Sequence, residues 1–557
     1  MKHGAGLGAM SKGRSSGRAW ATPTTLAILW GIAIVLAQAE IFAPERFNPE
    51  GLPLLWRFVQ ASVHPELEPE FLSLTLKATL TTLAYAICGT CLSTVLGIGG
   101  GLVCSQIWWL TICPHWSYRN VVWLTIRGLL AIPRAIHEMV WGLFLINLWG
   151  LDPLTALVAL TIPYGAIVAK VFSEILDETP REPLIALLNS GVAPLPALLY
   201  GLVPQAASNL LSYTLYRFEC ALRSATILGM IGAGGLGYEI LLSLQSLRYE
   251  QLWTLFYALI LLNGAVEFSP VLWCHRLNLS TILGMIGLCL FGFWGVNADF
   301  GKLWSPQTAH QLTDLLQIPL LPTWTATQVA QLLPLCVQTL GMSLLAMAIA
   351  SLGGLLLSFG AARNLVLPRG LLNPHPQGLT RSGLQGWAVF LSLRLVLLCC
   401  RAIPAPIWAL VTVFMVFPGM LPGAIALGLH NLGVLGRLMA DTNENLDPAP
   451  LAALQAQGTP RAQLFLYGVL PMNGSQFWAY GLYRWEVCIR ETVTIGLVGA
   501  GGLGLLLNEQ ISSFDAPGAI VTLSCFVILT FGVDTVSAAI RQGKRGKQGQ
   551  KPLLTCS

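Results

Sequence analysis

A short charged segment occurs twice in this otherwise apolar chain. In a helix, positions i, i+3 and i+7 lie on one face. Both copies place a tyrosine, a glutamate and an arginine at this spacing: Tyr216, Glu219 and Arg223, then Tyr483, Glu486 and Arg490. Ionisable groups inside a membrane helix are costly unless they pair or face water. We therefore expect both faces to look inward, toward a partner or a cavity.

Two interpretations of these charges remain open. In the structural one, each glutamate only neutralises the arginine one turn later. In the functional one, the additional arginines Arg217 and Arg484 leave surplus positive charge that lines a pathway for an anion. Arg134 and Arg401 allow the same two interpretations.

A glycine cluster follows each charged segment. Its members are Gly232, Gly234, Gly235 and Gly237 in the first copy, and Gly499, Gly501, Gly502 and Gly504 in the second. The pattern formally matches the dinucleotide fingerprint G-x-G-x-x-G, which has meaning only between a strand and a helix. Apolar helical sequence precedes and follows it here, which argues against a nucleotide site. The glycines predict either a break beside a pore, as part of a gate, or close helix packing.

No cofactor site is predicted within the chain. The single Cys-x-x-Cys, Cys88 and Cys91, lies in an apolar run without a second pair, so we predict neither metal binding nor redox chemistry. No phosphate-binding G-x-x-x-x-G-K-[ST] occurs, because Gly543-Lys544 is followed by Arg545. No nucleophile and base stand out either, so the chain is not predicted to be an enzyme.

The two charged segments belong to a long internal repeat. Tyr483 and Tyr216 differ by 483 − 216 = 267 positions, and the same shift relates Arg401 to Arg134 and Gly458 to Gly191. A register kept without a gap indicates two copies of one architectural unit. We predict one repeat over 1–275 and the other over 276–557.

Composition predicts an integral membrane protein. Hydrophobic residues make up 54% and charged residues 10% of the 557 residues, with a mean hydropathy of +0.66. The predicted fold is all-α, with about twelve transmembrane helices as two tandem six-helix repeats in pseudo-two-fold relation. The expected spans are 24–43, 74–103, 120–149, 153–172, 206–236 and 251–273, then 280–297, 333–361, 385–415, 418–440, 473–504 and 517–540.

Basic residues predict the orientation. Lys and Arg are concentrated in the tails 1–22 and 541–557, which are expected in the cytoplasm, whereas 44–72 is acidic and expected outside. The net charge of +5 then reflects topology and contact with membrane lipid, and no nucleic-acid partner is expected.

Each repeat also contains a short helix predicted on the cytoplasmic surface. A proline begins each helix, a glycine ends it, and a second proline follows thirteen residues later. The residues concerned are Ile185, Ala186, Leu187, Gly191 and Pro204, then Ala452, Ala453, Leu454, Gly458 and Pro471. Two matched surface helices suit docking onto cytoplasmic partners.

At these residues the sequence resembles the inner-membrane permease subunits of bacterial ATP-binding-cassette importers. Their cytoplasmic loop carries E-A-A, three residues, G and a distant L-P, although Ile185 and Ala452 replace the leading Glu here. The charged segments, the glycine clusters and Leu466 to Pro471 look like the phosphonate-uptake subfamily. The chain resembles two such permeases fused.

The resemblance implies an importer of type I in the bacterial inner membrane. It implies two cytoplasmic ATPase subunits that bind ATP-Mg, a periplasmic substrate-binding protein, and phosphonate, phosphite or phosphate as the oxyanion carried. Two rivals are an ion-coupled secondary transporter and a membrane enzyme acting on phosphorylated lipid. Neither rival needs two matched docking helices.

The two copies also differ at single positions. Ser224 corresponds to Glu491, Thr226 to Val493 and His137 to Pro404. We therefore predict an unequal pathway, with different contributions from Arg223 and Arg490.

Overall fold

The computed structural model is α-helical over most of the residues that it describes. It describes residues 51–113, 118–273, 279–296, 298–317, 325–367, 370, 381–413, 416–496 and 499–547. The predicted span 24–43 and the predicted repeat boundary at 275 lie outside these residues, as do the whole N-terminal basic tail 1–22 and residues 548–557 of the C-terminal one.

The first half contains eleven described helices and one π-helical turn. They are α2 (Gly51–Ala61), α3 (Pro69–Cys104), α4 (Gln106–Ile112), α5 (Arg119–Ala135), α6 (Glu138–Trp149), α7 (Pro153–Glu178), α8 (Glu182–Asn189), α9 (Pro194–Gly201), α10 (Val203–Leu228), the turn η2 (Gly229–Ala233), α11 (Leu236–Gln245) and α12 (Tyr249–Trp273). Prolines occupy the first turn of several of them, where a missing N–H leaves no bond unmade.

The second half repeats this order. Its described elements are α13 (Leu279–Val296), η3 (Phe300–Trp304), α14 (Pro306–Gln317), α15 (Ala326–Gly360), α16 (Arg363–Val366), α17 (Arg381–Ala402), α18 (Ala405–Val413), α19 (Met420–Glu444), α20 (Pro448–Ala456), α21 (Arg461–Leu464), η4 (Phe465–Val469), α22 (Leu470–Gly496), α23 (Gly502–Ser512) and α24 (Ala516–Lys547). The helix α15 packs along α19 as α3 packs along α7.

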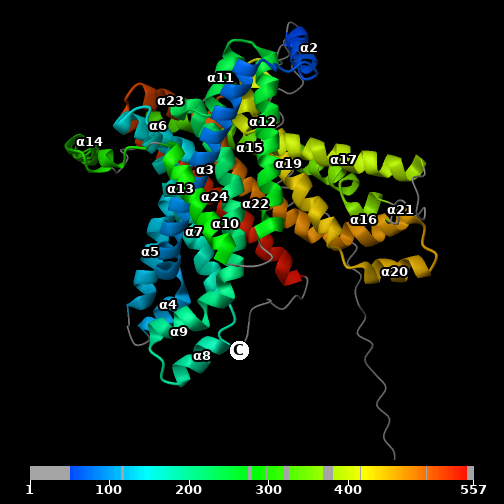
Figure 1. Cartoon of the computed structure of the whole chain (residues 1–557), viewed down its shortest axis with the longest axis horizontal. Coiled ribbons are helices and arrows are strands. Elements are labelled where there is room, and N and C mark those ends of the chain that lie inside the picture. The colour runs from blue at the N-terminus through cyan, green and yellow to red at the C-terminus, as the bar shows by residue number, and fades with distance from the viewer. Residues whose placement is uncertain are drawn as a thin grey trace, which may run out of the picture.

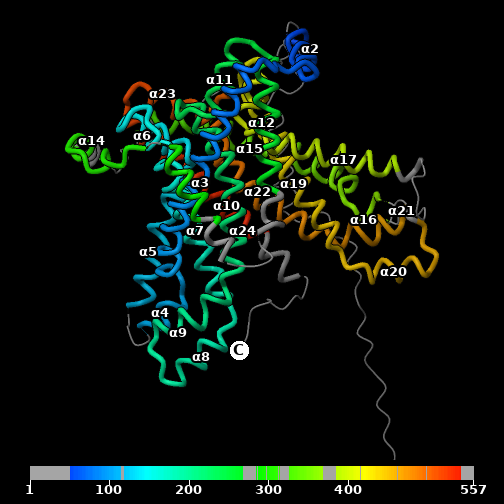
Figure 2. The backbone as a smooth tube through the Cα atoms, viewed as in Figure 1, coloured from blue at the N-terminus to red at the C-terminus, as the bar shows by residue number. Residues whose placement is uncertain are grey.

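The halves form two arms that meet in the centre of the molecule. One arm ends at α8 and α9 and the other at α20 and α21 (Figure 1). In the tube trace the blue-to-green and yellow-to-red segments meet centrally and diverge toward these two ends (Figure 2). The surface helices predicted to dock partners therefore lie at the tips of separate arms.

Among the described residues, six helices are long and apolar enough to cross a membrane, or up to eight if each bent pair is one span. The six are α3, α7, α15, α17, α19 and α24. The helix α22 is not among them, and it carries Arg484, Glu486, Arg490 and Glu491 within its apolar sequence. The membrane-spanning helical class is thus confirmed.

Two predicted spans of the first half are broken helices, and their equivalents 385–415 and 473–504 are also divided, into α17 with α18 and into α22 with α23. The span expected at 120–149 bends by 82° between α5 and α6, and the one expected at 206–236 bends by 59° between η2 and α11. Arg134 therefore lies at the end of α5, next to a bend, and Arg401 lies at the equivalent end of α17. The second bend coincides with the glycine cluster, as predicted.

Each half packs the start of one helix into a buried cluster of the other half. Ile403 and Ile407, at the start of α18, belong to the same buried cluster as Leu236 and Ile240 of α11 in the other half. In return, Ile136 and Val140 at the start of α6 belong to a cluster with Leu503 and Leu507 of α23. All four residues in the second cluster are repeat equivalents of those in the first, so each half completes the core of the other.

Candidate functional site

Arg217 and Arg484, which are repeat equivalents, point into the cores of their own halves. They are 9% and 8% exposed, respectively. Nε and Nη2 of Arg484 donate to Oδ1 of Asn431 at 2.8 and 2.5 Å, and Nη2 lies 3.2 Å from Oε1 of Glu491. The guanidinium of Arg217 lies 3.9 Å above the ring of Tyr164. Tyr164 is the repeat equivalent of Asn431, so the two arginines occupy equivalent places with different partners.

A second polar chain replaces the carboxylate in the first half. Ser224, the equivalent of Glu491, donates to Oε1 of Glu138, and its hydroxyl lies 2.7 Å from that of Tyr164. Nδ1 of His137 lies 3.4 Å from Glu138. The predicted differences at 224 and 137 therefore lie in one buried network that the second half lacks.

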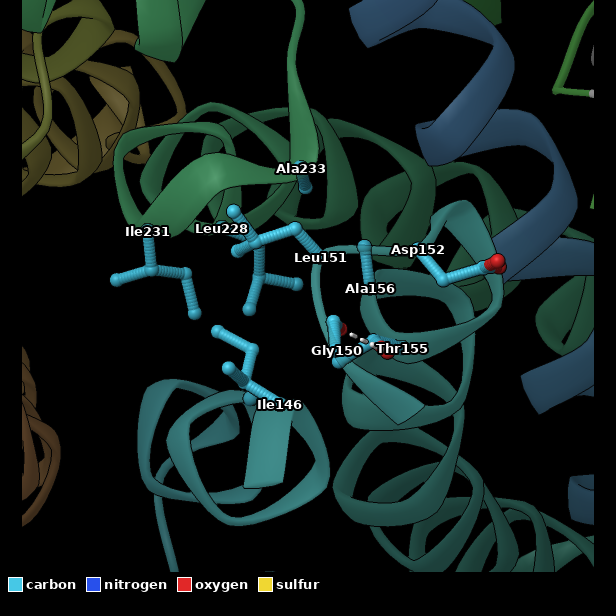
Figure 3. Close-up of a pocket in the computed structure, with 10 residues that line it drawn as sticks. Ile146, Gly150, Leu151, Asp152, Thr155, Ala156, Leu228, Ile231 and Ala233 are labelled. Atoms are coloured by element: carbon cyan, nitrogen blue, oxygen red, sulfur yellow. Dashed lines mark hydrogen bonds between the residues drawn. The ribbon is translucent and has the colours of Figure 1, made fainter. Parts of the chain in front are cut away.

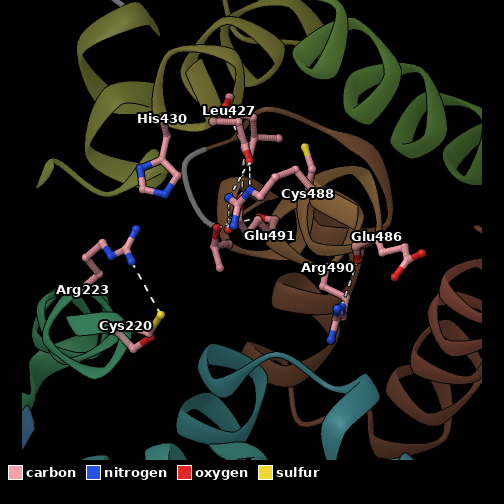
Figure 4. Close-up of polar contacts among 12 residues, drawn as sticks. Cys220, Arg223, Leu427, His430, Glu486, Cys488, Arg490 and Glu491 are labelled. Carbon is pink, nitrogen blue, oxygen red and sulfur yellow. Dashed lines mark hydrogen bonds and ion pairs between the residues drawn. The ribbon is translucent and has the colours of Figure 1, made fainter. Parts of the chain in front are cut away.

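Arg223 and Arg490 lie on the faces predicted from their spacing (Figure 4). Arg223 pairs with Glu219 at 3.5 Å and also contacts the sulfur of Cys220. Arg490 donates through Nε to the backbone carbonyl of Glu486 and through Nη1 to that of Arg134, at 3.0 and 3.4 Å. The pairing expected within the first copy is confirmed, and Arg490 reaches across to the other half.

A continuous set of ion pairs joins the two halves. In order of contact it consists of Arg223, Glu219, Arg401, Glu267, Arg437, Asp441, Arg394, Glu444 and Arg363. The crossing points are Glu219 with Arg401 at 3.5 Å and Glu267 with both Arg401 and Arg437, the latter at 3.3 Å. We call this set the inter-half network.

The repeat places equivalent charges on the opposite interface, but Asp534, Arg134 and Lys170 form no ion pair with one another within the described residues. The equivalents of Glu267 and Arg401 are Asp534 and Arg134. Within the described residues, Arg134 forms no ion pair and the buried Oδ1 of Asp534 has no hydrogen-bond partner. Lys170, the equivalent of Arg437, pairs with Glu174 on its own helix at 3.7 Å. In the described part of the chain, the ion pairs of Glu267 with Arg401 and Arg437 therefore have no counterpart among Asp534, Arg134 and Lys170.

Sequence reasoning missed most of the inter-half network, although a signal was present. At the 267-residue shift, five further pairs keep the sign of their charge: Arg127 and Arg394, Lys170 and Arg437, Glu174 and Asp441, Asp177 and Glu444, and Glu267 and Asp534. Charges repeated at corresponding positions of two apolar units indicate a shared interior role.

The two tyrosines of the charged segments are both exposed. Tyr216 and Tyr483 are 46% and 51% exposed. The predicted pathway residues are thus divided: Glu219, with its partner Arg223, contacts Arg401 of the other half, whereas Arg217 and Arg484 point into the cores of their own halves.

The glycine clusters both break the helix and permit close approach. Gly232, Gly234 and Gly235 have φ of +104°, +84° and +74°, and in the second copy Gly499, Gly501 and Gly502 have +82°, +80° and +73°. A Cβ on Gly237 would lie 1.8 Å from the carbonyl oxygen of Thr226. At the start of the helix after each break a backbone N–H donates to a threonine hydroxyl, Leu236 to Thr82 and Leu503 to Thr339. The glycine clusters thus combine the helix break and the close packing that the sequence offered as alternatives.

The predicted docking helices are present in both copies as α8 and α20. Gly191 and Gly458 end them with φ of +83° and +76°, a left-handed conformation that glycine adopts without strain. Leu184 and its equivalent Leu451 anchor each helix in a buried cluster. The predicted contact residues Ile185, Ala186, Ala452 and Ala453 are exposed, while Leu187 and Leu454 are half-buried and Pro204 and Pro471 begin the next long helices.

The opposite end of each repeat carries an exposed apolar tip. Leu247 and Phe514 end α11 and α23 with φ of +54° and +58°, and they are 49% and 77% exposed. A matching backbone bond closes each turn, from Arg248 to Ser243 and from Asp515 to Gln510. In Figure 1, α11 lies at the far end of its arm from α8.

A small cleft beside the first glycine break is apolar. It has an empty volume of about 220 Å³ and is lined by Gly142, Ile146, Gly150, Leu151, Asp152, Thr155, Ala156, Leu228, Ile231 and Ala233 (Figure 3). The carboxylate of Asp152 is occupied by the backbone N–H of Leu154 and by Lys302. The cleft offers no free cation to an anionic ligand. Within the described residues, no group of three or more His, Cys, Asp or Glu side chains could hold a metal.

Comparison with known families decides the class of protein. Residues 115–269 and 382–546 each match the family described as "Binding-protein-dependent transport system inner membrane component". The two matches begin 382 − 115 = 267 residues apart, which is the repeat shift. The chain belongs to this family. It is therefore a permease with two copies of the family's domain, and not an enzyme.

Named relatives of this permease transport oxyanions of phosphorus. The phosphate-import permease protein PhnE of Mycolicibacterium smegmatis is 26% identical over 475 residues, covering 83% of this chain and 84% of that protein. The phosphite transport system permease protein PtxC of Stutzerimonas stutzeri is 34% identical over 206 residues, 37% of this chain and 68% of that protein. The putative cryptic phosphonate transport system permease protein PhnE2 of Escherichia coli is 33% identical over 118 residues, 21% of this chain and 97% of that protein. No solved structure matches this chain.

The family assignment places this permease in the inner membrane as a component of binding-protein-dependent transport. It confirms the resemblance drawn from the docking helices and the charged segments. It also favours the importer over both rivals, because neither an ion-coupled transporter nor a lipid-modifying enzyme depends on a binding protein.

Proposed function

We propose that this permease imports an oxyanion of phosphorus, namely phosphonate, phosphite or phosphate. The observation that carries the proposal is the coincidence of two facts. The relatives are named for these three ions, and both copies place arginines in the buried helices α10 and α22. Guanidinium groups bind tetrahedral oxyanions by two parallel hydrogen bonds. The path runs between α10 and α22, past Tyr216 and Tyr483.

The transmembrane unit has twelve helices in two six-helix repeats with pseudo-two-fold symmetry. The reciprocal packing of α18 on α11 and of α6 on α23 supports this arrangement. So does the repeated bond from a threonine to the helix after each glycine break. The glycine breaks act as the gate, because an unwound segment held by a few polar contacts can change conformation without unpacking a whole helix.

Two cytoplasmic ATPase subunits dock on α8 and α20 and bind the ATP-Mg that drives transport. The exposed faces of these helices lie at the tips of the two arms, which suits one subunit on each. Both termini then lie in the cytoplasm, with the basic tails against anionic lipid.

A periplasmic binding protein delivers the oxyanion to the outer side. The exposed tips Leu247 and Phe514 suit contact with its two lobes, because large apolar side chains in a strained left-handed conformation need a compensating role.

Uptake in cells that lack this permease tests the proposal. Restoring the chain should restore uptake of labelled phosphate, phosphite or methylphosphonate, and an excess of the same unlabelled ion should compete while sulfate should not. A nucleotide-binding subunit should copurify with the chain. Competition by sulfate alone would contradict the proposed substrate class.

A further inference from the structure

The two copies differ in how one edge of an arginine is used. Nε and Nη2 lie along the same edge of a guanidinium group, and arginine uses this edge to bind oxygen atoms in a bidentate manner. In Arg484 that edge is filled, because both nitrogens donate to Oδ1 of Asn431 and Nη2 also lies 3.2 Å from Glu491. The charge of Arg484 is neutralised by the same carboxylate.

In Arg217 the same edge has no acceptor. Its Nε and Nη2 are buried and have no hydrogen-bond partner within the described part of the chain. Tyr164 stands where Asn431 stands in the other copy, and it presents the face of its ring instead of an oxygen. Leaving a buried N–H donor of a charged group unsatisfied costs about 1–3 kcal/mol or more. A buried donor pair of this kind is rare in proteins.

The carboxylate of Glu138 forms no ion pair with Arg217 within the described residues. Glu138 accepts from Ser224 and lies 3.4 Å from His137, and Ser224 also bonds to the hydroxyl of Tyr164. This network occupies the carboxylate. The ring of Tyr164 favours a cation above it without supplying a hydrogen-bond acceptor. The first copy thus keeps a positive, unfilled bidentate donor, whereas the second copy fills the equivalent one internally.

We propose that the Nε–Nη2 edge of Arg217 is a contact site for the transported oxyanion, and that only the first copy provides it. The inference rests on the proposed function and adds the residue that recognises the ion. Two oxygens of a tetrahedral phosphorus oxyanion accept from this edge the hydrogen bonds that Asn431 and Glu491 accept in the second copy. The neighbouring Tyr216 is 46% exposed, so this turn of α10 reaches the surface of the first half.

Replacing residues of the first copy by their equivalents from the second copy tests this site. Glu138→Ala combined with Ser224→Glu gives the first copy the residues that the second has at these positions, Ala405 and Glu491. The new carboxylate satisfies Arg217, so thermal stability in detergent should be kept or rise. The KM for uptake of the oxyanion should increase about tenfold or more, the loss of roughly 1.4 kcal/mol of binding.

Thr226→Val is the matched control, because it also introduces the second-copy residue, Val493, on the same helix. Thr226 is fully buried and bonds only to the carbonyl of Leu222, so the KM should not change. A folded Glu138→Ala/Ser224→Glu protein with an unchanged KM would overturn the inference while leaving the proposed function intact.

If the Glu138→Ala/Ser224→Glu protein does not fold, the single variant Arg217→Gln tests whether Arg217 contacts the oxyanion. This change removes the positive charge and both donors of the Nε–Nη2 edge. The KM should therefore rise by at least the factor expected for the double variant, whereas an unchanged KM would overturn the inference. A wild-type assembly that imports no phosphorus oxyanion would overturn the proposed function and this inference with it.

Discussion

The carboxylate of Glu219 lies 3.5 Å from the guanidinium of Arg401, and this ion pair joins the two halves of the permease. Arg401 also binds Glu267, so two acidic residues of the first half hold one arginine of the second. Its repeat equivalent, Arg134, forms no ion pair among the described residues. The pairing of Glu267 with Arg401 has no counterpart between Asp534 and Arg134 among the described residues, which fits a structure that changes state by making and breaking these pairs.

Glu267→Gln should destabilise the protein, whereas Asp534→Asn should not. The first change removes the carboxylate that binds the largely buried Arg401 and the partly exposed Arg437, and should lower the free energy of unfolding by about 2 kcal/mol. The second removes a carboxylate whose buried Oδ1 has no partner, and its effect should be below about 0.5 kcal/mol. Thermal unfolding in detergent compares the two variants. Equal losses would contradict a network closed on one side only.

Arg484→Gln should destabilise the second half far more than Arg217→Gln destabilises the first. Loss of Arg484 leaves the buried carboxylate of Glu491 without its cation, which costs about 3–5 kcal/mol. Loss of Arg217 removes a buried cation that lacks acceptors, so the cost should be much smaller. The yield of folded protein by size-exclusion chromatography distinguishes them. A larger loss with Arg217→Gln would show that its charge is structurally required.

Gly237→Ala should prevent folding. The new Cβ would lie 1.8 Å from the carbonyl oxygen of Thr226, and backbone on both sides leaves it no room. Gly128→Ala in α5 is the control, because nothing lies within 4 Å of a Cβ at that glycine. Expression and monodispersity in detergent measure the result. Normal folding of Gly237→Ala would mean that the helices at the first break do not approach as closely as described.

Ile185→Asp should weaken attachment of the ATPase without unfolding the permease. The side chain is 50% exposed on α8, while the helix is held in place by the neighbouring Leu184. Tyr238→Asp is the control, because Tyr238 is also exposed but lies on α11 at the other end of the arm. Copurification of the nucleotide-binding subunit measures attachment, and it should fall for Ile185→Asp alone. Equal copurification of both variants would remove α8 from the docking surface.

The sequence predicted what depends on local pattern and on the repeat. The ends of α8 and α20 follow from Gly191 and Gly458, because glycine is the residue that ends a helix in the left-handed conformation. The pairing of Glu219 with Arg223 follows from their spacing on one helix.

Contacts between distant segments could not be predicted in the same way. The stacking of Arg217 on Tyr164 and the crossing from Glu219 to Arg401 depend on how helices pack, which spacing within one helix does not encode. The bend between α5 and α6 was also missed. The apolar sequence 120–149 is long enough for one span, and only packing of Ile136 and Val140 into the other half shows that it turns.

Transport in sealed proteoliposomes tests the central claim most directly. The complete assembly, with binding protein outside and ATP inside, should accumulate labelled phosphate, phosphite or methylphosphonate, and omission of either ATP or the binding protein should abolish uptake. Uptake by the permease alone in vesicles without ATP would contradict the account.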